Sequence, residues 1–117
     1  MVTEKLGELA KRRRAAHMRF TALGSKTYQA FVTLEKATYA DGALSKRQKE
    51  LIAIGISIVL DCESCIQWHI EQAARAGASG REIMEAIDVG MEMGGGPATV
   101  SARFALDVMD AVFPDGI

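Results

Sequence analysis

The feature that most constrains the fold is the spacing of the apolar residues, which is helical along the whole chain. Ile83, Ile87 and Met91, for example, recur every four residues and share one side of a helix. No stretch alternates apolar and polar residues over the length of a strand. The 117 residues suffice for one modest core and leave no room for a second. We therefore predict an all-α fold, with residues 1–117 as a single domain.

Turn and capping residues divide this pattern into five to six helices that form a compact bundle. Ser45 with Gln48, and Ser79 with Glu82, match the capping box that opens a helix. Gly77 suits the position that follows a helix end. The first four helices are expected at about Thr3–Leu23, Lys26–Tyr39, Ser45–Leu60 and Cys62–Ala76. The fifth begins at Ser79 and ends at the Gly94–Pro97 run. The last follows this run and carries Val100, Phe104, Val108 and Val112 at a spacing of four residues.

The segment Leu51–Leu60 is apolar on nearly every side of its helix. A helix of that kind is normally buried all round. In so small a domain we expect part of this burial to come from another subunit, so the bundle would be completed by homo-oligomerisation. The segment is about half of the ~20 residues that a membrane-spanning helix requires, so no membrane partner is predicted.

Charge and cysteine usage narrow the function classes. The formal net charge of −1 creates no global attraction for nucleic acid. We expect the basic cluster Lys11–Arg14 and the nearby His17 to lie on a solvated face, without a role. The first residues are charged where a secretion signal needs an apolar core, so a cytoplasmic location is expected. Thiols are kept reduced there, and two cysteines then indicate catalysis or metal binding.

Both cysteines and one of the two histidines fall on one stripe of a predicted helix. Cys62 and Cys65 are three residues apart, and His69 follows Cys65 by four, so the three side chains share a face. Cys62 lies near the helix N-terminus, where unpaired amides and the helix dipole favour a thiolate. His69 is in reach to take or return a proton. Two thiols at this spacing can close into a disulfide.

Glu50 is the fourth candidate, at the edge of the apolar helix and twelve residues before Cys62. Burial of a carboxylate is costly unless it gains a partner. His69 is the candidate partner, because an acid that binds one ring nitrogen orients the other. If the third and fourth helices fold back on each other, Glu50 approaches the level of His69.

These residue patterns also allow other interpretations. The cysteines could be two buried apolar thiols, His69 a structural histidine, and Glu50 a complement to the helix dipole. A zinc site could use Cys62, Cys65 and His69, with His17 or Glu50 as a fourth ligand.

The pattern Glu50-x11-Cys62-x2-Cys65-x3-His69 resembles the alkylhydroperoxidase D-like group of the carboxymuconolactone decarboxylase family. The stretch MGGGPATVSARFALDVMD, from Met93 to Asp110, is similar to the C-terminal helix pair of that family. The resemblance covers about Leu44–Met109, over half of the chain.

The resemblance implies a helical trimer or hexamer with thiol-dependent peroxidase or disulfide reductase activity, no metal and no organic cofactor. Cys65 would attack a hydroperoxide and become a sulfenic acid, and Cys62 would condense with it to a disulfide. His69 and Glu50 would form a proton relay, and an external dithiol reductant would reset the pair. Ser64 stands where some members carry a second histidine between the cysteines, a departure that bears on the peroxidase rate.

Two other functions compete with this one. The first is a lyase, such as a decarboxylase acting on a lactone or keto acid, whose turnover would survive the loss of Cys62. The second is a non-catalytic, zinc-bound or redox-sensing oligomer, which would bind metal stoichiometrically or change its assembly with the disulfide.

Overall fold

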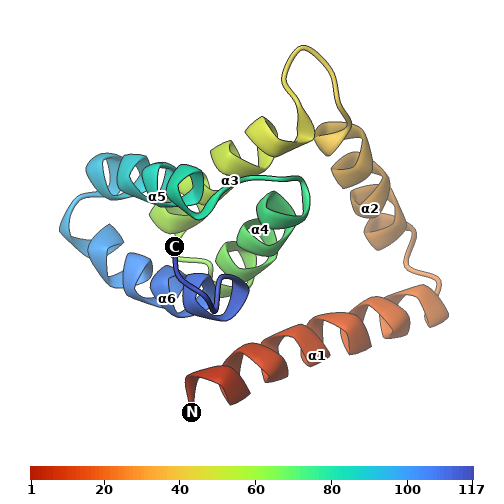
Figure 1. Cartoon of the computed structure of the whole chain (residues 1–117). Helices are drawn as coiled ribbons and strands as arrows, with labels where there is room; N and C mark the ends of the chain where they lie inside the picture. The colour runs from red at the N-terminus through yellow and green to blue at the C-terminus, as the bar shows by residue number, and fades with distance from the viewer.

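The computed structural model describes all 117 residues and contains six α-helices and no β-strand (Figure 1). The expected all-α fold is therefore confirmed, and the expected helix Lys26–Tyr39 coincides with a helix of the structure. The helices are α1 (Val2–Ala22), α2 (Lys26–Tyr39), α3 (Lys46–Leu60), α4 (Glu63–Arg75), α5 (Gly80–Gly94) and α6 (Gly96–Val112).

The helices begin where short polar side chains can cap them. The side chains of Ser25, Ser45 and Ser79 each accept a hydrogen bond from the amide three residues later. Both predicted capping boxes form, at Ser45 and at Ser79. Gly95, with φ of 72°, joins α5 to α6, a backbone conformation that favours glycine.

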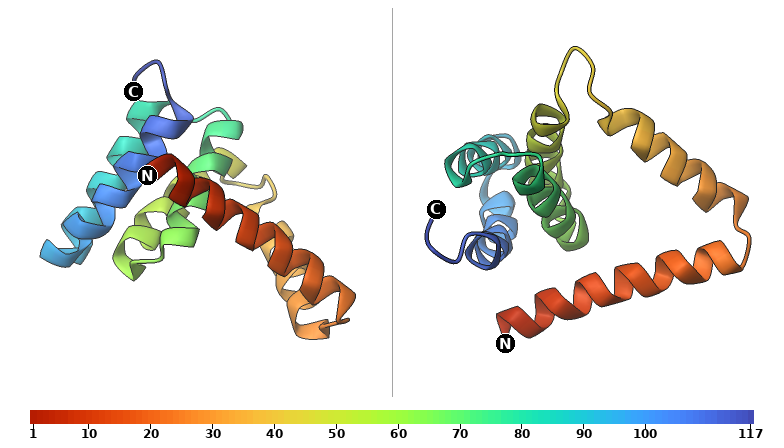
Figure 2. Two further views of the ribbon diagram at one scale, coloured as in Figure 1. Left: turned by 90° about the horizontal axis from the view of Figure 1, so that it is seen from below. Right: turned by 45° about the vertical axis from the view of Figure 1, so that its right-hand side comes forward.

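Helices α3–α6 pack together and form the four-helix core of the molecule. α3 lies against both α4 and α5, and α6 packs across α4 and α5 on the other side (Figures 1 and 2). Isoleucines from three of these helices fill the centre. Those with no more than 1% of their surface exposed are Ile54, Ile58, Ile66, Ile70, Ile83 and Ile87.

Two glycines bring α3 and α5 unusually close. A Cβ atom on Gly90 would lie 2.8 Å from the carbonyl oxygen of Gly55 and 2.9 Å from the Cβ of Ile58. A Cβ on Gly55 would lie 3.3 Å from the carbonyl oxygen of Ala86. This close approach explains why a glycine interrupts the apolar run of α3.

Helices α1 and α2 form an arm (residues 2–39) that is much less buried. α1 runs along one side of α4 and α6, and α2 leads from the end of α1 to the start of α3 (Figures 1 and 2). Leu6 is the only buried residue of the arm. Phe31 and Leu34 of α2 are each 59% exposed. No helix of the structure is both long and apolar enough to cross a membrane.

The exposed apolar residues of α3 and α6 show which faces of these helices the core leaves uncovered. Within one chain α3 is not buried all round, because Ile52 and Ile56 are 52% and 54% exposed. In α6, Phe104 and Val108 are buried, whereas Val100 is exposed. A spacing of four residues exceeds the 3.6-residue turn, so the series drifts around the helix, and Val100 leaves the buried face.

Candidate functional site

A tight reversal between α3 and α4 places the two helices side by side. Only Asp61 and Cys62 lie between the helices, and Asp61 has φ of 53° and ψ of 44°, a left-handed conformation that Asp tolerates better than most residues. Its carboxylate accepts a hydrogen bond from the Ser101 hydroxyl of α6, with 2.7 Å between the oxygens. The reversal thereby sets the start of α4 against the end of α3.

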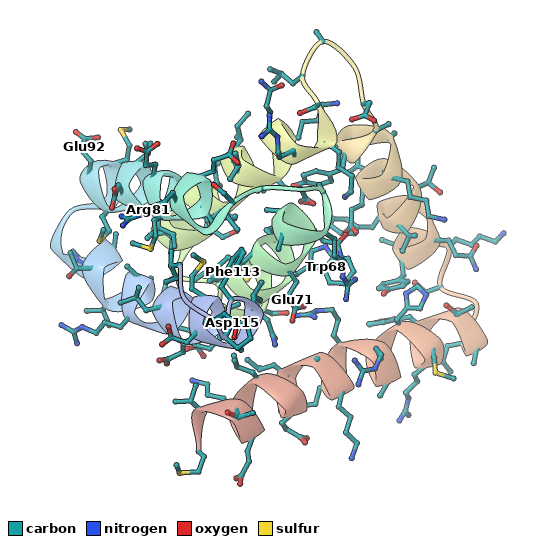
Figure 3. All side chains as sticks on the ribbon, viewed as in Figure 1. Trp68, Glu71, Arg81, Glu92, Phe113 and Asp115 are labelled. Carbon is teal, nitrogen blue, oxygen red and sulfur yellow. A yellow bond between two sulfur atoms is a disulfide. The ribbon has the colours of Figure 1, made fainter.

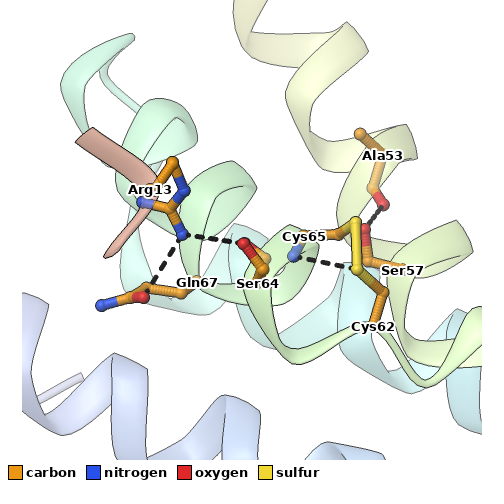
Figure 4. The surroundings of a disulfide bond; sticks show 7 residues. All are labelled: Arg13, Ala53, Ser57, Cys62, Ser64, Cys65 and Gln67. Atoms are coloured by element: carbon orange, nitrogen blue, oxygen red, sulfur yellow. Dashed lines mark hydrogen bonds between the residues drawn. A yellow bond between two sulfur atoms is a disulfide. The ribbon is translucent and has the colours of Figure 1, made fainter. Parts of the chain in front are cut away.

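The two cysteines lie at the first turn of α4, as expected, and are joined by a disulfide (Figure 4). Cys62 is the N-cap, and its sulfur accepts a hydrogen bond from the amide of Cys65 at 3.2 Å. The sulfur thus occupies the capping place that serine hydroxyls take in α2, α3 and α5. An N-terminal amide aimed at this sulfur would stabilise a thiolate there in the reduced protein.

The expected approach of Glu50 to His69 is present. Glu50 Oε1 lies 2.8 Å from His69 Nδ1, across the interface between α3 and α4. Glu50 is 1% exposed and His69 15% exposed in their side chains, so the pair is shielded from water. An ionised carboxylate can only accept, so Nδ1 donates, and in the neutral imidazole Nε2 then carries the lone pair. His69 follows Cys65 by four residues on α4, so the two side chains share one face of this helix.

Two residues that the sequence did not single out surround this pair. Lys46 Nζ lies 3.3 Å from Glu50 Oε2. The ring of Tyr39 lies 5.3 Å from the ring of His69, centroid to centroid. A cleft of about 410 Å³ opens here between α2, α3 and α4. Its lining consists of Glu35, Lys36, Tyr39, Ala40, Lys46, Glu50, Trp68 and Gln72.

Arg13 corrects the expectation that the whole basic cluster is solvated. Its guanidinium reaches α4, where Nη2 donates to the carbonyl oxygen of Ser64 at 3.1 Å and lies within 3.4 Å of Gln67 Oε1 (Figure 4). It also lies 5.2 Å from the centre of the Trp68 ring. Desolvation by burial lowers the pKa of Arg13. The available signal was its position seven residues after Leu6, which puts both on one face of α1.

The remaining sequence candidates stay apart from the cysteines. His17 is exposed as expected, and its Nδ1 lies 2.8 Å from the Tyr28 hydroxyl within the arm. It therefore does not complete a zinc site with Cys62 and Cys65. The structure assembles no group of three or more His, Cys, Asp and Glu side chains that could hold a metal ion.

Comparison with known proteins shows which family this chain resembles. The model of the carboxymuconolactone decarboxylase family matches residues 25–108, which is most of the chain. The chain belongs to this family. The match runs from the start of α2 to within α6 and includes all four candidate residues, Glu50, Cys62, Cys65 and His69.

Two curated relatives of this family member are named as uncharacterized proteins. The relative from Paracoccus denitrificans, uncharacterized protein 4 in the cox locus, is 45% identical over 89 residues, which are 76% of this chain and 80% of that protein. A relative from Cupriavidus necator is 34% identical over 108 residues, 90% of this chain and 96% of that protein.

Solved structures of family members share the fold over nearly the whole chain. A carboxymuconolactone decarboxylase family protein from Legionella pneumophila matches with a TM-score of 0.87 and 28% identity, over 93% of this chain and 97% of that one. A Thermotoga maritima family protein, for which a part in the antioxidative response has been suggested, matches with a TM-score of 0.84 and 29% identity. That match covers 92% of this chain and 91% of the other.

Proposed function

We propose that this family member is a thiol-dependent peroxidase or disulfide reductase that uses Cys62 and Cys65 as its redox pair. The observation that carries the proposal is the disulfide at the first turn of α4, on the face that also bears the Glu50–His69 pair. A two-electron switch and a shielded acid–base pair are the two parts that such a reaction needs. The antioxidative part suggested for the Thermotoga maritima relative is in line with it.

The first step oxidises Cys65. His69 Nε2 takes the thiol proton, and the Cys65 thiolate attacks one oxygen of the hydroperoxide. An S–O bond forms, the O–O bond breaks, and the sulfur gives two electrons to the peroxide. The departing alkoxide or hydroxide takes the proton back from His69, which leaves Cys65 as a sulfenic acid. Glu50 holds the imidazole by Nδ1 while its charge changes.

The second and third steps return the enzyme to its starting state. Cys62 attacks the sulfur of the Cys65 sulfenic acid, the S–S bond forms, the S–O bond breaks, and water leaves. An external dithiol then reduces the disulfide by two exchange reactions and becomes a disulfide itself. A cycle of this kind needs a reducing compartment, and we propose the cytoplasm. It needs neither a metal nor a bound organic cofactor.

The order of the two cysteines rests on two opposing arguments. The Cys65 amide that points at the Cys62 sulfur favours the thiolate at Cys62. The position of His69, four residues after Cys65, favours proton removal from Cys65. We assign the attack on peroxide to Cys65 because the family resemblance and the histidine both select it. Cys62 is then the resolving cysteine.

The experiment that tests the function is intact mass and free-thiol count of reduced, metal-free protein before and after one equivalent of hydroperoxide. The proposal expects a loss of two hydrogens and both thiols, reversed by a dithiol, and peroxidase turnover that Cys65→Ser abolishes. Persistent thiols would contradict it. Turnover of a lactone or keto acid that survives Cys62→Ser would then favour the lyase, and stoichiometric zinc would favour the metal-bound oligomer.

We also propose that the chain self-associates through a groove between α3 and α5. The groove has a volume of about 620 Å³, and eight of its twelve lining residues are hydrophobic, among them Ile52, Ile56 and Met93. Monomeric proteins rarely leave a large contiguous apolar surface in water. Sedimentation velocity should show a trimer or hexamer that Ile56→Glu dissociates. A monomeric unmodified protein at micromolar concentration would contradict the proposal.

A further inference from the structure

Glu50 binds two partners through its two oxygens, although its side chain is almost completely buried. Oε1 accepts from His69 Nδ1 and Oε2 lies 3.3 Å from Lys46 Nζ. Lys46 is four residues earlier on the same helix, so the ion pair spans one turn of α3. A buried carboxylate has to be compensated by opposite charge and hydrogen bonds. Lys46 is the only lysine or arginine side chain that forms an ion pair with it.

Tyr39 closes the same cluster from the α2 side. Its ring centre lies 5.3 Å from that of His69, with 35° between the ring planes. Lys46 Nζ lies 5.7 Å from the centre of the Tyr39 ring. Tyr39 therefore contacts His69, Lys46 contacts Glu50, and Tyr39 and Lys46 contact each other. Together with the Glu50–His69 hydrogen bond, these contacts join the four side chains in a closed ring.

The turn between α2 and α3 holds Tyr39 and Lys46 in register. The carboxylate of Asp41 accepts from the backbone amide of Lys46 at 2.7 Å. The carbonyl oxygen of Ala40 accepts from Lys49 Nζ at 2.6 Å. These two bonds tie the end of α2 to the start of α3, so the tyrosine and the lysine are placed by the same local structure.

The charges around Tyr39 favour its neutral form. Burial, together with the negative charges of Glu50 and then Glu35, raises the pKa of Tyr39. The phenol therefore stays protonated near neutral pH and brings no further negative charge to Glu50. Lys36 lines the same cleft but makes no hydrogen bond or ion pair in the structure, so its ammonium is spatially near without holding the carboxylate.

We propose that Lys46 is a positioning residue: by binding Oε2 of Glu50 it keeps Oε1 hydrogen-bonded to His69 Nδ1. His69 Nε2 is then left free to act as the base. Tyr39 covers the imidazole ring of His69. The effect on Cys65 chemistry rests on the proposed function. The orientation of His69 does not, because it is a property of the folded protein.

The test compares Lys46→Met, which removes the ammonium and keeps most of the aliphatic stem, with Lys46→Arg, which keeps the charge. Lys36→Met is the matched control for loss of a positive charge in the same cleft. The first readout is the ¹⁵N NMR spectrum of His69 in the disulfide form at pH 7.5, in a His17→Gln background that removes the other histidine. We expect the Nδ1–H tautomer to dominate in the unmodified, Lys46→Arg and Lys36→Met proteins, and to lose its dominance in Lys46→Met.

The second readout is the rate at which iodoacetamide alkylates the reduced thiols. Loss of the positioned base should slow alkylation of Cys65 by about 10-fold in Lys46→Met, with recovery in Lys46→Arg and no change in Lys36→Met. An unchanged His69 tautomer in folded Lys46→Met would overturn the inference. A shifted tautomer with unchanged alkylation would support the positioning of His69 and contradict the proton relay of the proposed function.

Tyr39 has its own matched pair. Tyr39→Phe keeps the ring over the imidazole and should leave the exchange of the His69 Nδ1 proton with water unchanged. Tyr39→Leu removes the aromatic cover and should speed that exchange by about 10-fold, since the protection of a buried group depends on the opening of what covers it. Equal exchange in the two variants would remove Tyr39 from the proposal.

Discussion

The four-helix core (α3–α6) and the arm (α1–α2) are built from the same kind of helix but are stabilised differently. The core holds every buried apolar residue except Leu6, and it carries Glu50, Cys62, Cys65 and His69. Many side chains of α1 and α2 project away from the core (Figure 3). The arm buries one residue and contacts the core through single side chains, of which Arg13 and Tyr39 are the clearest.

The reactive groups and the proposed positioning residue Lys46 thus lie on the core, whereas Arg13 and Tyr39 reach the site from the arm. A proton relay depends on distances near 3 Å, so its members belong on elements that packing holds rigidly. The arm lies outside the core that carries the cysteines. It can still alter their surroundings through the contacts of Arg13 with the first turns of α4.

The largest expected difference is in stability. Ile58 is fully buried and packs against Gly90, so Ile58→Ala leaves a cavity that should lower the free energy of unfolding by about 3 kcal/mol. Leu34→Ala in the arm removes a side chain that is 59% exposed and should change it by less than about 0.5 kcal/mol. Urea denaturation measures both. An equal loss at Leu34 would mean that another surface covers the arm in solution.

The two histidines provide the same comparison for reactivity. His69→Ala should slow the reaction of the Cys65 thiol with peroxide about 100-fold at neutral pH, because the base is gone. His17→Ala removes only a contact with Tyr28 inside the arm. Because an exposed hydrogen bond contributes little free energy, the rate should stay within about 2-fold of that of the unmodified protein. Stopped-flow rates between about pH 5 and pH 9 decide the matter. Unchanged reactivity of His69→Ala over that range would disprove the relay.

Arg13 tests how firmly the arm is attached. Arg13→Ala removes the hydrogen bonds to Ser64 and Gln67 and should lower the free energy that holds α1 on the core by about 1 kcal/mol. The main observable effect should be faster amide hydrogen exchange in α1. Arg12→Ala is the control, since Arg12 is exposed and makes no hydrogen bond in the structure. If both variants exchanged alike, α1 would be held by Leu6 and its neighbours alone.

The smallest expected effect is on acid stability. The backbone hydrogen bond from Ser79 lowers the pKa of Glu82, with a smaller contribution from Arg47. A carboxyl group with a lowered pKa in the folded state stabilises the protein above its unfolded pKa and loses that effect as the pH falls through the folded pKa. The melting temperature should therefore drop less between pH 7 and pH 3 in Glu82→Gln than in the unmodified protein. Glu85→Gln, an exposed neighbour, should behave like the unmodified protein.

Much of the fold could be predicted because the signals are local. The caps at Ser45 and Ser79 and the Gly94–Pro97 junction act over three or four residues, and each lies where the sequence predicted it. The outward-facing side of α3 could not be assigned, since an apolar face looks the same whether this chain or a second copy covers it. Oligomerisation stays a prediction for that reason.

The candidate site divides in the same way. The stripe of Cys62, Cys65 and His69 follows from helical periodicity alone, and α4 forms as expected. The contact of Glu50 with His69 was a hypothesis that required α3 and α4 to fold back on each other. Arg13 was predicted to be solvated because it lies in a basic cluster, although it shares a face of α1 with Leu6. Tyr39 and Lys46 carried no pattern that set them apart.

The sequence by itself determined where the helices begin and end, and which residues share a face of one helix, because both depend on interactions within one turn. The tertiary structure decided which faces meet. The left-handed turn at Asp61 sets α4 against α3, the Gly55–Gly90 approach sets α5 against α3, and only then does Glu50 reach His69 at 2.8 Å. Contacts between residues 19 or 51 positions apart depend on these packing angles, which no local spacing encodes.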